Sequence, residues 1–329
     1  MTKTAKPVGL IASLGAAAAL IVAADLLYHP FKNPILPVSE WAQHGVNWLA
    51  QVARPTFVIL RVPLAAMLDG LLVALRAIPP SIFIIAFFLT AWQLAGLRLA
   101  MGCAIGLLLL GLIGVWDDTM ITVAIILAAV ILCVVIGIPL GIAAAKSPKF
   151  SAVVRPVLDV MQTCPAFVYL VPIVMLIGIG NVPGIAVTVI FALPPLIRLT
   201  ELGIRHVPAH IVEASEAMGA SPTQILLDVE LPLALHTIMA GVNQTLMMAL
   251  SMVVVASMIS VEGLGLLVLR GIGRLDMGLA TLGGIGIVVL AMVLDRLTQA
   301  VAGPAEPRSA NRRGPVELVR DLWRAGKAR

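Results

Sequence analysis

Two groups of polar side chains interrupt long apolar runs in this sequence, and their types could serve the passage of a polar solute. They are Asp159, Gln162, Thr163 and Tyr169 in the first group, and Asn243, Gln244 and Thr245, followed by Met248, in the second. Polar groups inside a membrane cost free energy and often line a transport path, and a tyrosine ring can pass a cation by cation–π contact. Both groups predict either a translocation path or hydrogen bonds between helices. The methionines around Met248 fit either a pliable lining or plain core packing.

A third polar interruption, residues 206–232, has the spacing of two short helices separated by a sharp turn. Pro208 suits a helix start, because its missing N–H has no helical partner there anyway. Apolar residues at helical spacing predict one apolar stripe on the first helix. They are Val207, Ile211, Ala214 and Met218. With Glu213 and Glu216 on its wet side, this helix is expected to touch a partner outside the membrane.

The turn and the second helix of this stretch are indicated by three further signals. Gly219 can end the first helix in a left-handed conformation at little steric cost. Ser221 before Pro222 is a cap and first-turn pair that opens the second helix. We expect Leu231 and Pro232 to close the unit just before the next apolar run.

The patterns of common enzymes are absent from the sequence. The nucleotide-binding pattern G-x-x-x-x-G-K-[ST] does not occur, because its nearest match at residues 141–147 lacks the glycine before the lysine. No Ser/His/Asp or H-E-x-x-H arrangement occurs either. We therefore predict a chain that is not an enzyme and holds no cofactor of its own. Any ATP hydrolysis that drives it must come from another chain.

Cysteine and histidine usage gives little support to a metal site or a disulfide. Cys103, Cys133 and Cys164 all lie inside apolar runs and are expected to be small buried hydrophobes. His206 and His210 are four residues apart and could share a helical face, but no third ligand is nearby. We predict no bound metal.

Composition assigns the chain to an all-α integral membrane protein. Of its 329 residues, 60% are hydrophobic and only 12% are charged, with a mean hydropathy of +1.06. Ordinary soluble domains are much less apolar. The net charge of +5 does not indicate nucleic-acid binding, because the basic residues lie in the predicted loops and tail, where they orient a membrane protein.

The predicted elements begin with a membrane helix and a surface segment. Residues 1–28 hold an apolar run, 8–28, that is long enough to cross a bilayer core. It could be a signal peptide, but it lacks a clean cleavage site, and we expect a retained first span. Residues 29–80 are expected to form an interfacial amphipathic segment, with one surface helix at 38–58. Residues 62–78 are either a second surface helix, which we favour, or a partial span.

Residues 81–302 are expected to form the main transmembrane domain, and 303–329 a basic tail. Seven spans are predicted there, which gives about eight in all. Their ranges are 81–97, 101–115, 119–145, 156–180, 185–197, 233–259 and 280–294. Gly137 and Gly141 in the third of these have the spacing of a close-packing motif. Residues 262–278 are expected to form a glycine-rich loop.

Charge sets the predicted orientation. The basic segments near residue 98, at 146–155 and at 198–205, and the tail, all fall on the side of the N-terminus. Loops rich in lysine and arginine stay in the cytoplasm, so both termini and residues 206–232 are expected there. Arg270 and Arg274 fall on the other side and disagree with this assignment.

The stretch 206–232 resembles the EAA loop of the permeases of ATP-binding-cassette (ABC) importers. That pattern is E-A-A, three residues, G, nine residues, then I-x-L-P. It stands here as Glu213-Ala214-Ser215, Gly219 and Val229-Glu230-Leu231-Pro232, with Ser215 and Val229 as mild departures. Over roughly 47–302 the chain is similar to the permease family of proline/glycine betaine importers, through segments 159–184, 191–204, 231–259 and 268–300.

The resemblance implies the transmembrane domain of a type I importer in a bacterial inner membrane. The complex would contain two permease copies, two ATPase chains that hold ATP and Mg²⁺, and a periplasmic binding protein. Its substrate would be a compatible solute such as glycine betaine, proline betaine, choline, carnitine or trimethylamine N-oxide. The ATPase-coupling residues implied are Glu213, Ala214, Ser215, Gly219, Leu231 and Pro232.

Two other classes of function remain open. An ion-driven secondary transporter or a channel would want paired, deeply buried carboxylates and inverted repeats. Asp159 and Asp295 lie near the ends of predicted spans, and no internal repeat is found. A membrane scaffold without transport would leave the 206–232 unit unexplained.

Overall fold

The computed structural model describes residues 37–302, together with the isolated positions 20 and 22. The predicted first span at 8–28 and the tail at 303–329 lie essentially outside the described residues. Within the described part the chain is helical, and no strand occurs there. The chain divides into two compact units, 1–53 and 54–329.

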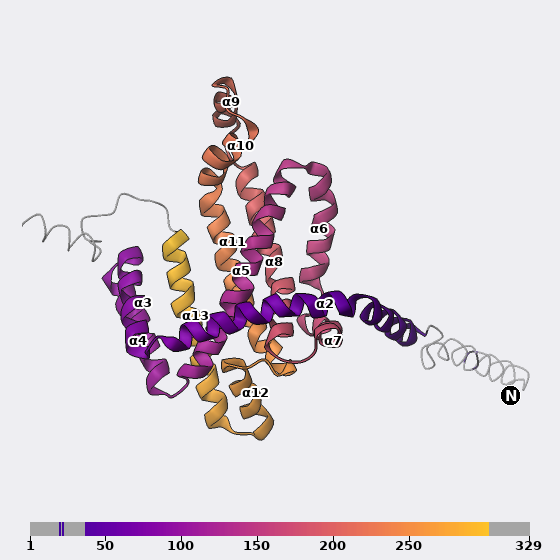
Figure 1. Cartoon of the computed structure of the whole chain (residues 1–329), viewed down its shortest axis with the longest axis vertical. Coiled ribbons are helices and arrows are strands. Elements are labelled where there is room, and N and C mark those ends of the chain that lie inside the picture. The colour runs from indigo at the N-terminus through magenta and orange to yellow at the C-terminus, as the bar shows by residue number, and fades with distance from the viewer. Residues whose placement is uncertain (1–19, 21, 23–36, 303–329) are drawn as a thin grey trace, which may run out of the picture. The chain divides into compact units, whose positions relative to one another are not determined.

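The helices succeed one another with short connections (Figure 1). They are α2 (Val38–Ala77), α3 (Pro80–Ala95), α4 (Leu97–Leu112), α5 (Trp116–Lys146), α6 (Pro148–Thr163), α7 (Ala166–Ile177), α8 (Asn181–Arg205), α9 (Ala209–Ala217), α10 (Pro222–Gln224), a π-helix (Ile225–Glu230), α11 (Leu231–Ala256), a 3-10 turn (Ser257–Ile259), α12 (Leu264–Arg274) and α13 (Met277–Ala302). Prolines open α3, α6 and α10, where a missing N–H costs nothing.

The seven apolar segments predicted between residues 81 and 302 are mostly helical, but the span predicted at 156–180 is broken at Cys164 and Pro165 into α6 and α7. Helices α5, α8, α11 and α13 belong to segments long and apolar enough to cross a membrane, and α6 and α7 together form a pair bent by 100°. Helices α3 and α4 have 16 residues each, which is about 24 Å at 1.5 Å per residue and shorter than a ~30 Å hydrocarbon core.

Helix α2 differs from the prediction of two surface helices. It runs unbroken for 40 residues through Pro55 and Pro63. A proline removes one backbone hydrogen bond, but the flanking residues still favour a helix. Its part Gln51–Ala77 is also long and apolar enough to cross a membrane, although little of it is buried in this chain.

Helices α6 and α12 replace predicted loops. Ser147 accepts a hydrogen bond from the N–H of Phe150 at 3.3 Å, so a helix starts within the basic segment predicted as a loop. It ends at Cys164, whose extended backbone (φ −71°, ψ 129°) precedes Pro165. The supposed glycine-rich loop at 262–278 forms the amphipathic helix α12, whose Gly271 packs against Ala280 of α13.

The core is built where α5 and α11 pack on α8. A Cβ added to Gly137 would lie 3.1 Å from side-chain atoms of Leu193 and Leu196, and one added to Gly141 would lie 2.5 Å from Cβ of Thr200. The predicted close-packing role of this glycine pair is confirmed. Gly241 brings α11 equally close to α8. Helix α9 lies beyond one end of these helices and α12 beyond the other (Figure 1).

Candidate functional site

The first helix of the 206–232 unit has the predicted ends. Helix α9 begins directly after Pro208. Gly219 adopts φ +84°, the left-handed region that favours glycine. The N–H of Gly219 donates to the carbonyl of Glu216 at 2.9 Å, and the N–H of Ala220 donates to that of Ser215 at 3.1 Å. A Cβ at Gly219 would meet nothing within 4 Å. Glycine is therefore favoured here by the left-handed backbone conformation and not by a lack of room for a side chain.

The second helix opens with the predicted cap but does not end where predicted. Ser221 and Gln224 form a capping box, in which Ser221 N–H donates to Gln224 Oε1 at 2.8 Å. The chain then continues without a break from α10 through the π-helix into α11. The expectation that Leu231 and Pro232 close the unit is wrong. Pro232 stands in the first turn of α11, inside this continuous helix, where it cannot donate the usual backbone hydrogen bond, and Leu231 N–H donates to the carbonyl of Leu226, five residues back.

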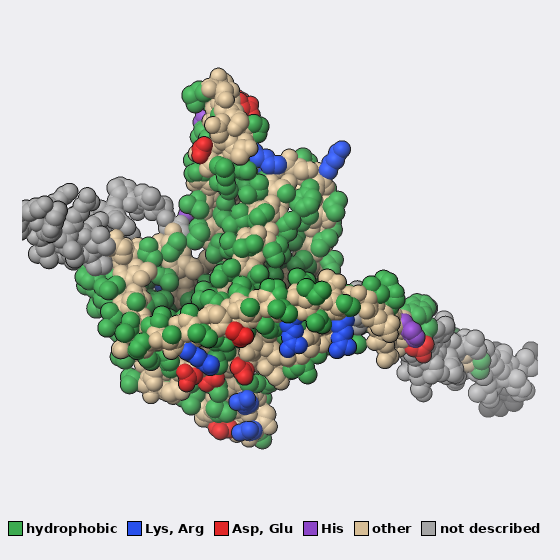
Figure 2. All heavy atoms as spheres, in the orientation of Figure 1, with side chains coloured by type: hydrophobic (Ala, Val, Ile, Leu, Met, Phe, Trp, Pro, Cys, Tyr) green, Lys and Arg blue, Asp and Glu red, His purple; other side chains and the backbone are tan. Residues whose placement is uncertain are grey.

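The outer face of α9 is not the one that apolar spacing predicted. Ser215 is buried and donates its hydroxyl to the carbonyl of Ile211 at 2.8 Å. Met218, which the predicted stripe placed inside, is 82% exposed. Glu213, Ala214 and Glu216 are exposed as well, and Figure 2 shows acidic side chains on this tip. Since the described residues leave this face uncovered, it combines carboxylates with an apolar side chain in a form suited to a protein partner.

A hollow of about 340 Å³ lies beside this turn. Its lining residues are Ser215, Met218, Gly219, Ala220, Gln224, Asp228 and Val229. Three of the pattern positions, Ser215, Gly219 and Val229, therefore share one concave surface. The turn at Gly219 brings the two halves of the unit together around it.

Ion pairs tie this unit to the transmembrane helices. Lys146 at the end of α5 pairs with Glu230 of the π-helix at 2.6 Å, and the glutamate side chain is only 8% exposed. On α8, the buried Glu201 accepts hydrogen bonds from Ser151 Oγ at 2.8 Å and from Arg155 Nη2 at 2.9 Å. Arg205 lies 3.0 Å from the same carboxylate oxygen. The ion pair at Glu230 thus joins the unit to the end of α5, and the contacts of Glu201 join α6 to α8.

Sequence reasoning missed Glu201 and Glu230 as functional candidates. Their partners on other helices, Arg155 for Glu201 and Lys146 for Glu230, lie 46 and 84 residues away, so no local pattern indicates these contacts. The available signals were the i,i+4 spacing of Glu201 and Arg205 and the presence of glutamates beside an apolar span, which calls for a partner.

The first group of path candidates gathers around the α6–α7 bend. Asp159 pairs with Arg198 of α8 at 2.5 Å, with its side chain 63% exposed. Both line a hollow of about 360 Å³. Gln162 is half-buried, and Thr163 makes only a long contact of 3.5 Å with the carbonyl of Val160. Tyr169 spans the bend by donating its hydroxyl to that same carbonyl at 2.9 Å.

The second group does not form one surface. Asn243 faces α13, where it donates to Asp295 Oδ1 at 3.3 Å and accepts from the hydroxyl of Thr298. Gln244 is exposed, whereas Thr245 is fully buried and its hydroxyl has no partner among the described residues. Met248 packs against the hydrophobic core. For Asn243 the alternative of an interhelical hydrogen bond is confirmed, and so is core packing for Met248.

The described residues hold no group of three or more His, Cys, Asp or Glu side chains that could bind a metal ion. Cys103 and Cys133 are buried and Cys164 half-buried, all three as free thiols. His206 donates from Nδ1–H to the carbonyl of Leu202, 2.8 Å away. These groups carry no further chemistry at the site.

An all-helical membrane bundle with a two-helix loop such as 206–232 at one end is typical of the permease subunit of an ABC importer. A family model described as "Binding-protein-dependent transport system inner membrane component" matches residues 137–307. The chain belongs to this family and is a multi-pass inner-membrane transport subunit.

Individual relatives and solved structures agree with this assignment. The chain is 56% identical over 294 residues to the glycine betaine/proline betaine transport system permease protein ProW of Escherichia coli K12, covering 88% of this chain and 83% of the relative. It is 42% identical to the glycine betaine transport system permease protein OpuAB of Bacillus subtilis, covering 82% and 96%. An inward-facing structure of the MetNI methionine ABC transporter matches its fold with a TM-score of 0.52 at 22% identity, covering 59% of this chain and 95% of that one.

Proposed function

We propose that this chain is the permease of an ATP-driven importer for a quaternary ammonium or methylated-amine compatible solute. The observation that carries the proposal is the 56% identity, over 88% of the chain, with a permease named for glycine betaine and proline betaine. A second relative at 42% identity is named for glycine betaine alone. Uptake assays with each solute decide among betaines, choline, carnitine and trimethylamine N-oxide.

The assembly is inferred from the family's dependence on a binding protein. Two copies of this chain pair with two ATPase chains, which hold ATP and Mg²⁺, and a periplasmic binding protein delivers the solute. Both termini and α9 lie in the cytoplasm. The exposed carboxylates Glu213 and Glu216 and the exposed Met218 supply the face that docks on the ATPase.

Coupling runs from α9 into the bundle through rigid joints. Gly219 and the capping box at Ser221 fix the angle between α9 and α10. Glu230 then binds this unit to α5 through its ion pair with Lys146, and Glu201, one turn before the unit begins, binds α8 to α6. When the ATPase dimer closes, the two α9 helices approach each other and the helix ends move with them, which alternates access between the two sides of the membrane.

Asp159, Gln162, Thr163 and Tyr169 are the residues of this chain that suit a cationic solute along the path. The carboxylate of Asp159 is largely exposed despite its ion pair, and an aromatic ring and a carboxylate are the groups that attract a quaternary ammonium. From the second group, Gln244 is the exposed side chain, while Thr245 and Asn243 act through packing and hydrogen bonds within the bundle.

The test compares Gly219→Val with Gly219→Asn in the complete importer, reconstituted with its ATPase and binding protein. A β-branched residue is strained at φ +84°, whereas asparagine tolerates that region. We expect betaine uptake and betaine-stimulated ATP hydrolysis to fall at least tenfold for Gly219→Val and to stay near wild type for Gly219→Asn. Both variants should assemble normally.

Two results would contradict the proposal. If Gly219→Val couples as well as Gly219→Asn, α9 does not transmit the ATPase movement. If uptake persists when the ATPase is omitted, the chain is a secondary transporter or a channel.

A further inference from the structure

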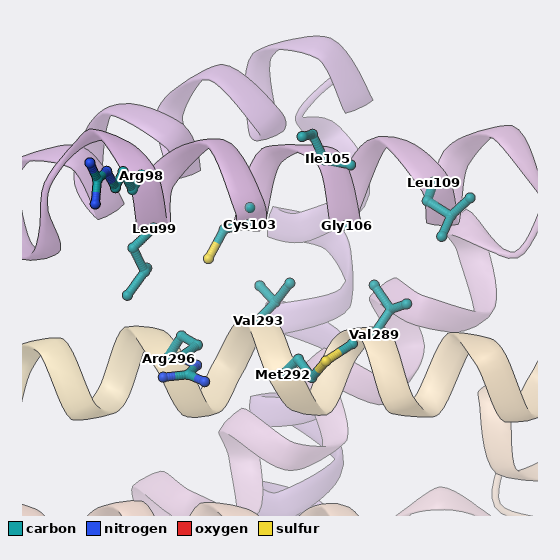
Figure 3. A pocket seen from close by; sticks show the side chains of 11 residues that line it. Arg98, Leu99, Cys103, Ile105, Gly106, Leu109, Val289, Met292, Val293 and Arg296 are labelled. Carbon is teal, nitrogen blue, oxygen red and sulfur yellow. The ribbon is translucent and has the colours of Figure 1, made fainter.

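A cleft of about 560 Å³ lies between α4 and α13, away from the unit that carries α9 (Figure 3). Its lining is apolar apart from two arginines, Arg98 on α4 and Arg296 on α13. The volume falls in the range of about 300–1,000 Å³ that small-molecule sites occupy. We propose that this cleft binds one anionic phospholipid, with an acyl chain along the cleft and the phosphate between Arg98 and Arg296.

Close packing at one end of the two helices leaves space at the other. A Cβ added to Gly106 would lie 3.1 Å from Val289 and 3.2 Å from Val293, so α4 and α13 are in contact there. One turn earlier, a Cβ on Gly102 would meet nothing within 4 Å. The cleft is therefore narrow at Gly106 and open around Gly102, and the two arginines stand beyond Gly102, at this open end, in Figure 3.

The dimensions suit an acyl chain. The lining on α4 extends from Arg98 to Leu109, which is about 16 Å of helix at 1.5 Å per residue. One leaflet of a ~30 Å hydrocarbon core has about the same depth. Ile105 and Met292 on the rim are 67% and 55% exposed, as expected of side chains that face lipid.

The positive charges of Arg98 and Arg296 at the open end have no acidic partner in an ion pair among the described residues. The ion pairs found among residues 37–302 engage Lys146, Arg155, Arg198 and Arg205, not the two arginines of the cleft. Asp295, next to Arg296, instead accepts hydrogen bonds from Asn243 and Gln299. Basic pockets between membrane helices bind anionic head groups. Residues 303–329, which come after α13, carry a net positive charge.

Both arginines lie at the end of the bundle that carries α9. Helix α5 runs from Trp116 to Lys146, and Lys146 pairs with Glu230 beside that unit. Helix α4 joins the opposite end of α5 through residues 113–115. The first turn of α4, with Arg98, therefore lies toward α9. This places the phosphate at a membrane surface and the acyl chain inside the bilayer.

Native mass spectrometry of the full-length permease in detergent, titrated with phosphatidylglycerol or phosphatidylcholine, tests the proposal. We expect wild type to retain phosphatidylglycerol in preference. The double variant Arg98→Gln/Arg296→Gln should lose roughly fivefold in affinity per arginine, with phosphatidylcholine binding unchanged. The matched control Arg270→Gln/Arg274→Gln removes the same charge from α12 and should keep wild-type binding.

A second variant covers the case in which the double variant does not fold. Gly102→Leu adds a side chain to the cleft at a position where a Cβ meets nothing within 4 Å and leaves both arginines in place, so it should also lower phosphatidylglycerol retention. Equal losses in the α12 control, or no loss in either cleft variant, would overturn the proposal. So would a Gly102→Leu protein that keeps its lipid but changes from dimer to monomer, because the cleft would then belong to a contact between two copies.

Discussion

At the scale of single residues, two carboxylates at the same end of the bundle stand in opposite environments. Glu201 has a side chain only 6% exposed and shared by Arg155 and Arg205. Asp159 pairs with Arg198 alone and is 63% exposed. Removing one partner of a buried ion pair leaves an uncompensated charge, whereas an exposed pair contributes little. The charge of Glu201 should therefore matter for the stability of the protein, whereas the charge of Asp159 should matter little for stability.

We expect Glu201→Gln to lower the free energy of unfolding by about 2–3 kcal/mol, because two arginines lose their shared carboxylate in a desolvated position. Asp159→Asn should cost less than about 1 kcal/mol. Thermal unfolding of the solubilised permease measures both. Equal destabilisation by the two substitutions would contradict the assigned roles. Loss of betaine uptake by Asp159→Asn at unchanged stability would support its place on the path.

Roles that depend on neighbouring residues could be predicted from the sequence, whereas roles that depend on contacts with distant residues could not. Gly219 and Ser221 were predicted with the correct roles, because a helix end and a cap depend on a few neighbouring residues. Glu201 and Glu230 depend on basic residues brought in by other helices. Met218 had the spacing of a buried residue but is exposed, because the C-terminal end of α9 extends past the ends of the bundle, where no helix among residues 37–302 covers it.

At the scale of elements, close contact between α5 and α8 depends on glycine. A Cβ at Gly141 would lie 2.5 Å from Cβ of Thr200 and 2.9 Å from the carbonyl oxygen of Ile197. The second of these is backbone and cannot turn aside. Small residues at such crossings let helix backbones approach each other.

Gly141→Ala should therefore push the two helices apart and lower the melting temperature of the solubilised permease by several degrees, at a cost of about 1–3 kcal/mol. Gly284→Ala in α13 is the matched control, since its added Cβ meets nothing within 4 Å. That change should be neutral or should stabilise the helix by about 0.5–1 kcal/mol. A Gly141→Ala protein as stable as the Gly284→Ala protein would show that this crossing tolerates a larger separation.

The helices that could be predicted from the sequence differ from those that could not in the strength of their hydrophobic signal. Long apolar runs gave α5, α11 and α13, because hydrophobicity over about 20 residues is a strong signal. Basic residues at 146–155 and glycines at 262–278 suggested loops, but these segments form α6 and α12. Their polar or glycine faces are accommodated by neighbours, as Gly271 is by Ala280. Tertiary packing thus overrides composition in both.

At the scale of the whole molecule, the bundle presents different surfaces at its two ends. One end carries α9 with Glu213 and Glu216, and the other carries α12 with its exposed Ile272 and Leu275. At the α12 end, Glu262 N–H donates to Asn181 Oδ1 at 2.8 Å and Leu264 N–H to Thr122 Oγ1 at 2.9 Å, which fixes α12 to α8 and α5. An importer needs such a division, with an ATPase on one side and a binding protein on the other.

The charge pattern predicts that α9 lies in the cytoplasm, and single-cysteine labelling tests this prediction. In a background without Cys103, Cys133 and Cys164, a membrane-impermeant maleimide should label Ile272→Cys, but not Glu216→Cys, in right-side-out vesicles. Inverted vesicles should reverse the result. Both positions are exposed on the protein, and the reversal in inverted vesicles separates the side of the membrane from burial in lipid. Labelling of both from the same side would mean that the bundle does not cross the membrane between α9 and α12, and the assignment of α9 to an ATPase would fall with it.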